Sequence, residues 1–315
     1  MGYRILNTLD LSGCPEAIDA FDGIGTVDTI PADYASVSAA IGDYDAYLPS
    51  LKVPVDSALV QRASRLKVIG TPSTGTDHLD LAAIRAAGIA CFDIAREFEL
   101  INSFSATSEL AFGALLALNR KICEARRAVL EGNWGREAFT GFQLLGKTLG
   151  IVGLGRLGKI SARIGNGFGM RVIACDIRDE SAPGVMLSDF DTVVRESDVL
   201  TIHVHLRDDT RGMISRDVLG RMKPNAILLN TSRGALVDEA ALLDALRTGR
   251  IAGACVDVID GEWLDDVRQH PLVQHARTHD NLLIVPHIGG ATNESIYGAR
   301  IFMARKVADY LKGLK

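Results

Sequence analysis

Short apolar runs alternate with amphipathic segments along most of the chain. In the first hundred residues, helical patterns cover residues 54–65 and 79–87, and Gly88 stops the second of them. The apolar runs around these segments predict strands; they lie at residues 3–6, 25–29, 46–48, 66–69 and 89–92. Strands that alternate with helices are typical of a parallel sheet covered on both faces. We therefore expect a small α/β domain in this part of the chain.

A second series of apolar runs begins at Thr148, again with helical segments between the runs. Six strands are predicted, at residues 148–153, 171–176, 199–204, 226–230, 252–258 and 282–286. Six parallel strands joined by helices match the doubly wound plan that binds nucleotides. We therefore expect a second, larger α/β domain.

Two further helical patterns link the series. Residues 105–130 predict one long helix, which is apolar on nearly every side between Leu110 and Leu118 and so should be buried. We expect it to cross between the domains. Residues 293–314 predict a final helix, and we expect it to pack back onto the first domain.

These patterns predict a discontinuous first domain. We assign residues 1–101 together with 289–315 to it, and residues 102–288 to the second domain. Flexible joints are expected near residues 101–105 and 288–291, where the chain passes from one domain to the other.

Composition narrows the classes of partner. The chain has 315 residues, 47% of them apolar, and 34 Lys and Arg against 39 Asp and Glu, a formal net charge of −5. A slightly acidic chain without a basic run lacks the electrostatic footprint for nucleic acid or an anionic membrane. Small molecules are the expected partners.

The cysteines favour a reducing compartment. They are five in number, widely spaced, and never form a CxxC pair, so we expect neither a disulfide framework nor a metal site. The first residues lack the cationic and apolar regions of a secretion signal. We therefore expect a cytoplasmic location.

A glycine-rich segment follows the strand that begins at Thr148. Residues Gly153, Gly155, Arg156, Leu157 and Gly158 belong to a GxGxxG turn that opens a helical pattern. The first glycine permits a tight turn, the second lets a pyrophosphate approach the backbone, and the third lets the helix pack on the strand. The N–H groups at the start of the helix face the anion.

Asp176 completes this pattern, just after the next predicted strand and 18 residues beyond Gly158 (176 − 158). Its carboxylate can accept hydrogen bonds from the adenosine ribose hydroxyls and would repel a 2′-phosphate. We therefore expect NAD as the cofactor and consider NADP less favoured, although the nearby cation of Arg178 argues in the other direction.

Five segments in a fixed order together resemble one family. They are LKVIGTPSTGTDHLDL, LLGKTLGIVGLGRLG, MKPNAILLNTSRGALVDEAAL, GACVDVIDGE and VPHIGGAT. In these segments the chain resembles the D-isomer-specific 2-hydroxyacid dehydrogenases, and most of all their phosphoglycerate-dehydrogenase-like members. The resemblance implies an α/β fold of two doubly wound parallel-sheet domains, a Rossmann NAD domain inserted in a flavodoxin-like substrate domain. It also implies a homodimer built through the NAD domain and the helix at residues 105–130.

Three residues carry the expected chemistry. Arg233 follows a buried strand at the edge where open α/β sheets bind ligands, and its guanidinium can grip a substrate carboxylate. His287 is the candidate general acid and base. By the family pattern Glu262 orients His287, and we prefer it to the nearby Asp260. Trp263 stands where the family usually has proline, which leaves the geometry of this loop open.

The resemblance implies further binding residues. Asp257 resembles the residue that binds the nicotinamide carboxamide, with a helix cap as its alternative role. The backbone of Ser73, Thr74 and Gly75 is expected to bind the substrate carboxylate. The expected lining of the cofactor side is Thr231 and Ser232.

Two histidines are set apart by their spacing. His203 and His205 alternate along a predicted strand, so we expect both on one side of it, where a role near the cofactor is open. No carboxylate or cysteine is spaced to complete a metal site with them. We therefore expect no bound metal.

The resulting prediction is an oxidoreductase that exchanges a hydride between NAD(H) and a D-2-hydroxy acid or its 2-oxo acid. Residues 71–76 contain no Lys or Arg to meet a phosphate, so phosphoglycerate is not assigned as the substrate. A regulatory protein that senses dinucleotides on the same fold is the alternative from another class. A methyltransferase that uses the glycine turn for S-adenosylmethionine is a second enzymatic alternative.

Overall fold

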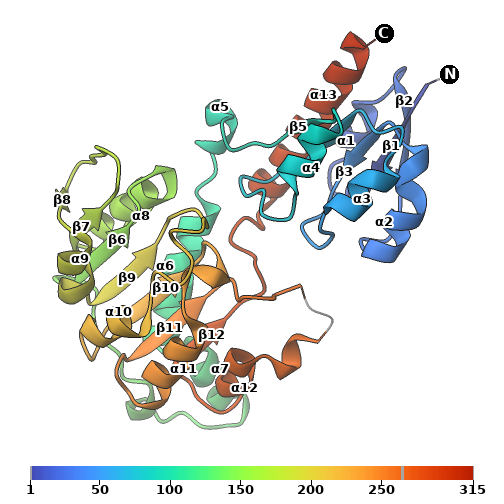
Figure 1. Cartoon of the computed structure of the whole chain (residues 1–315). Coiled ribbons are helices and arrows are strands. Elements are labelled where there is room, and N and C mark those ends of the chain that lie inside the picture. The colour runs from blue at the N-terminus through green and yellow to red at the C-terminus, as the bar shows by residue number, and fades with distance from the viewer. Residues whose placement is uncertain (1, 264–265, 315) are drawn as a thin grey trace. The chain divides into compact units, whose positions relative to one another are not determined.

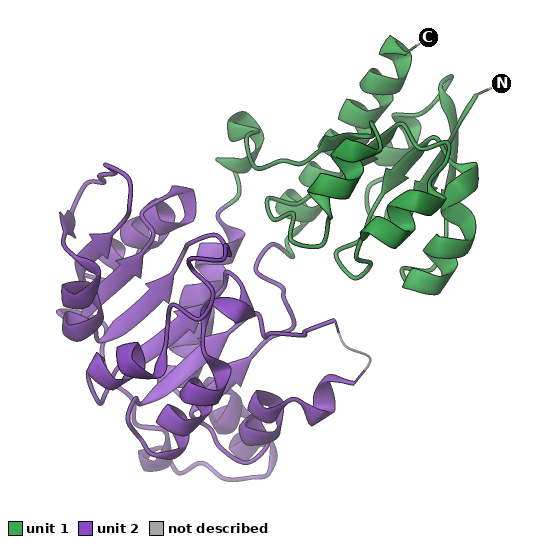
Figure 2. Cartoon of the chain, in the orientation of Figure 1, with its two compact units in different colours: residues 1–104, 291–315 green, residues 105–290 purple. Residues whose placement is uncertain are grey.

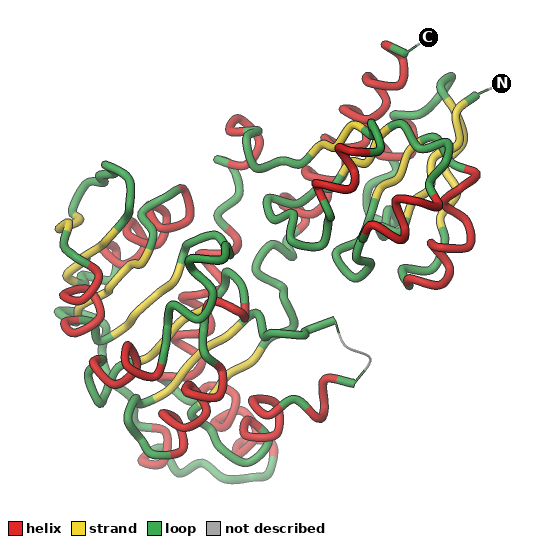
Figure 3. Tube along the Cα trace, in the orientation of Figure 1, coloured by secondary structure: helices red, strands yellow, loops and turns green. Residues whose placement is uncertain are grey.

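The computed structural model describes residues 2–263 and 266–314. The chain forms two compact units, unit 1 (Met1–Phe104 with Ala291–Lys315) and unit 2 (Ser105–Gly290), which are coloured separately in Figure 2. The boundaries expected from the sequence, after residues 101 and 288, lie within three residues of these. Each unit alternates strands and helices, as Figure 3 shows.

Unit 1 is built on a parallel sheet of five strands in the order β2-β1-β3-β4-β5, the order of flavodoxin-like folds. In the register, Ile5 pairs with Val27 on one side and with Ala46 on the other. The strands are β1 (Tyr3–Asn7), β2 (Gly25–Thr29), β3 (Ala46–Leu48), β4 (Val68–Gly70) and β5 (Ala90–Phe92).

The last helix of the chain, α13, completes the core of unit 1, as expected from the sequence. A Cβ added to Gly70 would lie 2.4 Å from Val307, so glycine at the end of β4 lets α13 approach the sheet. Met303, Val307 and Leu311 are fully buried in this core. The helical elements of unit 1 are α1 (Glu16–Asp19), α2 (Tyr34–Ala40), η1 (Ile41–Asp43), α3 (Ser57–Arg62), α4 (Leu81–Ala86), α5 (Phe98–Ile101) and α13 (Asn293–Gly313).

Unit 2 is built on a parallel sheet of seven strands in the order β12-β11-β10-β9-β6-β7-β8, which Figure 1 labels. Counted from β6, its first six strands have the order 3-2-1-4-5-6 of a dinucleotide-binding sheet. The strands are β6 (Thr148–Val152), β7 (Arg171–Cys175), β8 (Val185–Leu187), β9 (Val199–Ile202), β10 (Ile227–Asn230), β11 (Gly253–Val256) and β12 (Leu282–Ile284). The edge strand β8 was not predicted, because a half-exposed run of three residues has too little periodicity to be recognised.

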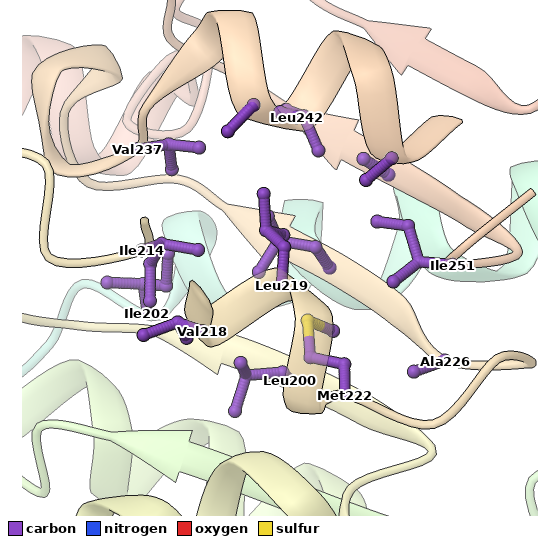
Figure 4. Close-up of a cluster of buried hydrophobic side chains, with 14 of the residues drawn as sticks. Leu200, Ile202, Ile214, Val218, Leu219, Met222, Ala226, Val237, Leu242 and Ile251 are labelled. Carbon is purple, nitrogen blue, oxygen red and sulfur yellow. The ribbon is translucent and has the colours of Figure 1, made fainter. Parts of the chain in front are cut away.

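Helices cover both faces of this sheet. On one face Leu200 and Ile202 of β9 pack with Leu219 of α10 and Leu242 of α11, as Figure 4 shows. The helical elements of unit 2 are α6 (Ala106–Asn119), α7 (Ile122–Leu130), η2 (Glu137–Phe139), α8 (Arg156–Gly167), α9 (Phe190–Glu196), α10 (Arg216–Arg221), η3 (Gly234–Leu236), α11 (Glu239–Arg247), η4 (Val267–Gln269) and α12 (Pro271–Ala276).

The single helix predicted for residues 105–130 is wrong. The chain forms α6 and α7, and Lys121 between them has φ +49°, a left-handed conformation that an α-helix cannot contain. Phe112 and Leu115 of α6 are buried in the core, whereas no residue of α7 is buried. Helix α6 therefore contributes side chains to the core of unit 2, whereas α7 lies on its surface.

The residues from Phe98 to Asn119 have the length and the mean hydropathy, 1.2, of a membrane-spanning helix. In the structure they form α5 and α6, and residues 102–105 between these are not helical. The apolar side chains of α6 pack against β10, β11 and α8 in unit 2. The core of this unit thus accounts for the hydropathy of α6.

Candidate active site

The glycine turn joins β6 to α8. Gly153 has φ +95°, and a Cβ there would lie 2.5 Å from the carbonyl oxygen of His203. A Cβ at Gly158 would lie 2.1 Å from the carbonyl oxygen of Gly153. At Gly155, by contrast, the nearest atom is the end of the flexible Arg178 side chain, at 3.3 Å. The first and third glycines are therefore required by the protein itself, and the second leaves room for a ligand.

The start of α8 presents backbone donors to this room. Gly155 is the N-cap and has no side chain to satisfy the N–H groups of the first turn. Arg156 and Leu157 are the first two helical residues, and burial lowers the pKa of the Arg156 guanidinium. Helix N-termini of this kind bind phosphate groups.

Asp176 lies immediately after β7, beside the glycine turn. Its Oδ2 accepts a hydrogen bond from the N–H of Leu154 at 2.7 Å, and its Oδ1 accepts one from the N–H of Arg178 at 2.9 Å. Burial acts to raise the pKa of this carboxyl, but the hydrogen bonds from Arg178 and Leu154 outweigh burial and lower the pKa. Asp176 is therefore a carboxylate, as ribose binding requires.

Arg178 is held by acidic side chains. Its Nε lies 3.2 Å from Asp176 Oδ1, and its Nη1 lies 3.4 Å from Glu180 Oε1. Two carboxylates thus compete with any 2′-phosphate for this guanidinium. In the sequence, the positive charge of Arg178 favoured NADP. In the structure this charge is paired with Asp176 and Glu180, which favours NAD.

The histidine turn follows β12. His287 has φ +52°, an uncommon conformation for a residue other than glycine. Its N–H donates to the carbonyl oxygen of Asp257 at 2.8 Å, and the carboxylate of Asp257 accepts the N–H groups of Ile288 and Gly289 at 2.7 and 2.8 Å. The buried Asp257 therefore imposes the backbone conformation of His287.

This arrangement changes the view of Asp257. The alternative role considered for it, a helix cap, is wrong, because its carboxylate binds the N–H groups of a turn. Burial raises its pKa, although the two N–H groups and His287 act in the opposite direction. Its predicted contact with the nicotinamide carboxamide stays a prediction.

His287 and Glu262 form a close pair. His287 Nδ1 lies 2.6 Å from Glu262 Oε1, and the two side chains are 20% and 17% exposed. Nδ1 therefore carries the proton and donates it to the carboxylate, which leaves Nε2 for a reacting group. The described residues show no such contact between His287 and the carboxylate of Asp260, the alternative considered; the backbone N–H of Asp260 donates to Glu239.

Trp263 is a site residue whose role was not predicted from the sequence. Its ring stacks on the imidazole of His287, with the ring centroids 5.7 Å apart and the planes at 24°. The indole ring therefore covers one face of the imidazole. The signal in the sequence was the replacement of the family's usual proline at this position.

Arg233 lies on the neighbouring strand end. It follows β10, and its carbonyl oxygen accepts a hydrogen bond from Asn230 Nδ2 at 2.8 Å, while its Nη1 donates to the carbonyl oxygen of Ser232 at 2.7 Å. Because β10, β11 and β12 are adjacent and parallel, the segments carrying Arg233, Glu262 and His287 leave the sheet at the same edge.

Thr231 and Ser232 differ in the freedom of their hydroxyls. Ser232 Oγ donates to the carbonyl oxygen of Ile202 at 2.8 Å, so this hydroxyl supports the loop. Thr231 Oγ1 is buried and has no hydrogen-bond partner among the described residues. A buried polar atom left unsatisfied is costly, so Thr231 is the one of the two that a bound cofactor would satisfy.

A cavity of about 510 Å³ lies in unit 2 beside the pair formed by His287 and Glu262. Glu262, Trp263 and His287 line one part of it, and residues 282–286, in and after β12, line another. Its size is within the range of small-molecule pockets. The Glu262 carboxylate and the His287 imidazole therefore border a cavity large enough for a small molecule.

The expected carboxylate-binding loop lies in unit 1. Ser73, Thr74 and Gly75 follow β4, and the N–H of Gly75 donates to Ser73 Oγ at 3.1 Å. Arg233, Glu262 and His287 all belong to unit 2.

The prediction that His203 and His205 share one side of a strand is wrong. Strand β9 ends at Ile202, so the alternation of a strand does not continue through these residues. His203 points inward, where Nε2 contacts Ser161 Oγ at 2.9 Å and Thr201 Oγ1 at 3.1 Å, and burial lowers its pKa to about 4. His205 is exposed.

Metal ligands do not gather in the part of the chain that the structure describes, where no three His, Cys, Asp or Glu side chains form a group that could hold an ion. All five cysteines are free thiols there, Cys14 and Cys255 being buried and Cys123 exposed.

Comparison with known proteins finds a family match within unit 2. Residues 112–289 match the family described as D-isomer specific 2-hydroxyacid dehydrogenase, NAD binding domain. The chain is 37% identical over 284 residues to a glyoxylate reductase of Thermococcus litoralis, covering 87% of this chain and 82% of the relative.

Longer relatives and a solved structure are also similar. A D-3-phosphoglycerate dehydrogenase of Archaeoglobus fulgidus is 36% identical over 275 residues, covering 86% of this chain but 50% of the relative. The chain thus spans about half the length of such dehydrogenases. The crystal structure of the TT0316 protein from Thermus thermophilus has a TM-score of 0.84 and 33% identity, covering 98% of this chain and 96% of that one.

Proposed function

The chain belongs to the D-isomer specific 2-hydroxyacid dehydrogenase family, and from this premise we propose that it interconverts a D-2-hydroxy acid and its 2-oxo acid. The observation that carries the proposal is the 2.6 Å contact between His287 Nδ1 and Glu262 Oε1, at the sheet edge that also carries Arg233. A dehydrogenase of this kind needs one proton carrier and one carboxylate anchor, and these residues supply both groups.

NAD fits the residues present. Gly155 leaves room for the pyrophosphate, the first N–H groups of α8 face that room, and Asp176 is a carboxylate for the ribose hydroxyls. Thr231 offers a buried hydroxyl without a partner among the described residues. When bound there, NAD would supply the hydride acceptor for C2 of the hydroxy acid, and NADH the hydride donor for the 2-oxo acid.

The protein residues supply binding and proton transfer. Arg233 grips the carboxylate of the acid through two parallel hydrogen bonds, which fixes the orientation of C2. In oxidation, Nε2 of neutral His287 takes the hydroxyl proton as the hydride leaves C2. In reduction, the protonated ring returns that proton to the oxygen. The Glu262 carboxylate stabilises the ring while it is charged.

We propose a small unphosphorylated 2-oxo acid as the substrate. Residues 71–76, which include the Ser73–Gly75 loop, carry no Lys or Arg to meet a phosphate. The similarity to a glyoxylate reductase supports the same choice. A dinucleotide-sensing regulator is not favoured, because the relatives found are dehydrogenases and reductases.

The test is turnover of the purified chain with NADH or NADPH. The acids compared are glyoxylate, hydroxypyruvate, pyruvate, 2-oxoglutarate and phosphohydroxypyruvate. We expect NADH oxidation with at least one unphosphorylated acid. We expect His287→Ala to lower kcat roughly 100- to 10,000-fold, since general acid–base catalysis contributes on that scale, and to leave the Kd for NADH within about twofold. Turnover of His287→Ala at the wild-type rate contradicts the assignment of His287.

We also propose a homodimer that forms through α7 rather than through α6, because the buried apolar side chains of α6 pack in the core of their own unit. Ile122, Val129 and Leu130 are 52%, 47% and 70% exposed. Their spacing places them on one face of α7. The cytoplasmic location expected from the sequence remains a proposal.

A further inference from the structure

Two segments of unit 2 that carry catalytic residues lie against each other. Gly234, next to Arg233, faces the start of the segment that leads to Glu262. A Cβ at Gly234 would lie 2.2 Å from the carbonyl carbon of Ile259 and 2.3 Å from the nitrogen of Asp260. The two backbones are therefore in direct contact, and a shift of one moves the other.

Glu239, the first residue of α11, bonds to the second segment at two points. Its Oε1 accepts the backbone N–H of Asp260 at 2.8 Å, and its Oε2 lies 3.1 Å from His270 Nε2. The Glu239 and His270 side chains are only 18% and 11% exposed. Between the two contact points, Asp260 and His270, the chain carries Glu262.

The tautomer of His270 determines which group is the donor in its contact with Glu239. His270 is the N-cap of α12, and its Nδ1 accepts the N–H of Leu272 at 3.3 Å. A neutral ring that accepts at Nδ1 carries its proton on Nε2, so His270 donates to the Glu239 carboxylate. The carboxylate thus accepts one bond from each end of the segment.

The charge of Glu239 depends on these contacts. Burial raises its pKa and the carboxylate of Asp260 adds to that, whereas the Asp260 N–H and His270 act to lower it. A buried carboxylate is costly to remove from water unless hydrogen bonds replace the lost hydration. Its two partners, both on the segment around Glu262, supply that replacement.

We propose that Glu239 is a positioning residue: it keeps the segment that carries Glu262 in a fixed position relative to the segment that carries Arg233. Two bonds from α11 fix Asp260 and His270, and Asp260 is two residues from Glu262. A displaced Asp260 displaces Glu262 and lengthens its 2.6 Å contact with His287. This inference rests on the proposed function, which assigns the roles of Arg233, Glu262 and His287.

Three variants separate the two contacts that Glu239 makes with Asp260 and His270. Glu239→Ala removes both contacts. Glu239→Gln keeps an oxygen for Asp260 but presents an amide N–H₂ to the His270 Nε2–H, so one contact is lost. His270→Asn keeps a side chain that caps α12 but is too short to reach Glu239. The matched control is Asp217→Asn, an exposed acid in the first turn of α10.

The kinetic result expected is a selective loss. Glu239→Ala should lower kcat/KM for the 2-oxo acid roughly 10- to 100-fold, mainly through kcat, as supporting residues of active sites do. Glu239→Gln and His270→Asn should lie between it and the wild type. The Kd for NADH should stay within about twofold in all of them, because the glycine turn is on another part of the sheet. The upper pH limit of 2-oxo acid reduction should move to lower pH, because protonated His287 loses its aligned carboxylate.

A second readout does not need turnover. In a Trp134→Phe background, Trp263 is the remaining tryptophan, and it stacks on His287. Its fluorescence should therefore change with pH as His287 takes up a proton. Glu239→Ala should move the midpoint of this change to lower pH, and Asp217→Asn should leave it in place.

The outcomes are distinct. Wild-type kinetics, pH profile and fluorescence midpoint in Glu239→Ala and His270→Asn, with only a lower Tm, would make Glu239 an ordinary structural anchor and overturn the proposal. If Glu239→Ala does not fold, Glu239→Gln and His270→Asn decide by the same criteria. If the wild-type chain reduces no acid, the proposed function fails, and the fluorescence midpoint still decides whether Glu239 positions Glu262.

Discussion

At the scale of the residue, the three glycines of the turn after β6 are glycine for different reasons. Gly153 needs a positive φ and Gly158 touches backbone, so both are required before any ligand binds. Gly155 has ordinary dihedrals and faces only a flexible side chain. The sequence pattern alone does not reveal this difference, because all three positions carry the same letter.

Gly155→Ala should therefore separate binding from folding. We expect the Kd for NADH to rise roughly tenfold, the equivalent of about 1.4 kcal/mol, because the new methyl group enters the space for the pyrophosphate. Stability should change little, since the end of the Arg178 side chain has to shift by only a few tenths of an ångström. The measurement is NADH fluorescence titration alongside urea unfolding.

Two other glycines calibrate this experiment. Gly167→Ala, in the last turn of α8, meets no atom within 4 Å and should leave the Kd for NADH unchanged. Gly153→Ala should lower the free energy of unfolding by roughly 1–2 kcal/mol from its positive φ alone. An unchanged Kd for NADH in Gly155→Ala contradicts the assignment of the turn to the pyrophosphate.

At the scale of the element, local patterns predicted most strands and failed where tertiary contacts override them. The strands β2 and β3 were predicted to the residue, and a helix was predicted to begin at the glycine turn, where α8 begins. The break at Lys121 was missed, because neither glycine nor proline marks it in the sequence. The end of β9 before His203 was missed because the apolar alternation continues beyond the last paired residue.

The inward histidine after β9 gives unit 2 a pH-dependent stability. Burial lowers the pKa of His203 from 6.5 to about 4 in the folded state. Between these values the unfolded chain binds a proton that the folded chain does not, so stability falls as the pH falls from 6.5 towards 4. The full effect is on the order of 3 kcal/mol.

His203→Gln should remove this dependence. The terminal amide of glutamine reaches about as far as Nε2 and does not titrate, so it can still bond Ser161 and Thr201. The free energy of unfolding, measured in urea at pH 7, 6 and 5, should fall less steeply in the variant than in the wild type. Parallel curves contradict a neutral His203 whose ring faces inward.

At the scale of the whole molecule, the chain is organised as two units, each with its own core. The core of unit 1 includes side chains of α13, at the end of the chain. In the sequence, unit 2 therefore lies between the two parts of unit 1. All residues proposed for proton transfer and for NAD belong to unit 2. The expected carboxylate-binding loop, Ser73 to Gly75, belongs to unit 1.

The proposed homodimer is also decided at this scale. We expect the wild-type chain to sediment at twice its mass of 33.8 kDa, and Leu130→Glu to sediment at 33.8 kDa, because a charge is placed in the apolar face of α7. Leu187→Glu, on β8 at the other edge of the sheet, is the control and should remain a dimer. A dimeric Leu130→Glu places the interface elsewhere.

The amino-acid sequence by itself determined the alternation of strands with helices, the α/β class of both units and the glycine turn, because these follow from local periodicity and from the conformations open to glycine. Only the tertiary structure decided that Glu262, 25 residues from His287, contacts it at 2.6 Å, and that Asp257 binds the turn beside it. It alone brought Glu239 to Asp260 and His270. Such contacts depend on which strand ends become neighbours and on what is buried between them, and local sequence periodicity carries neither.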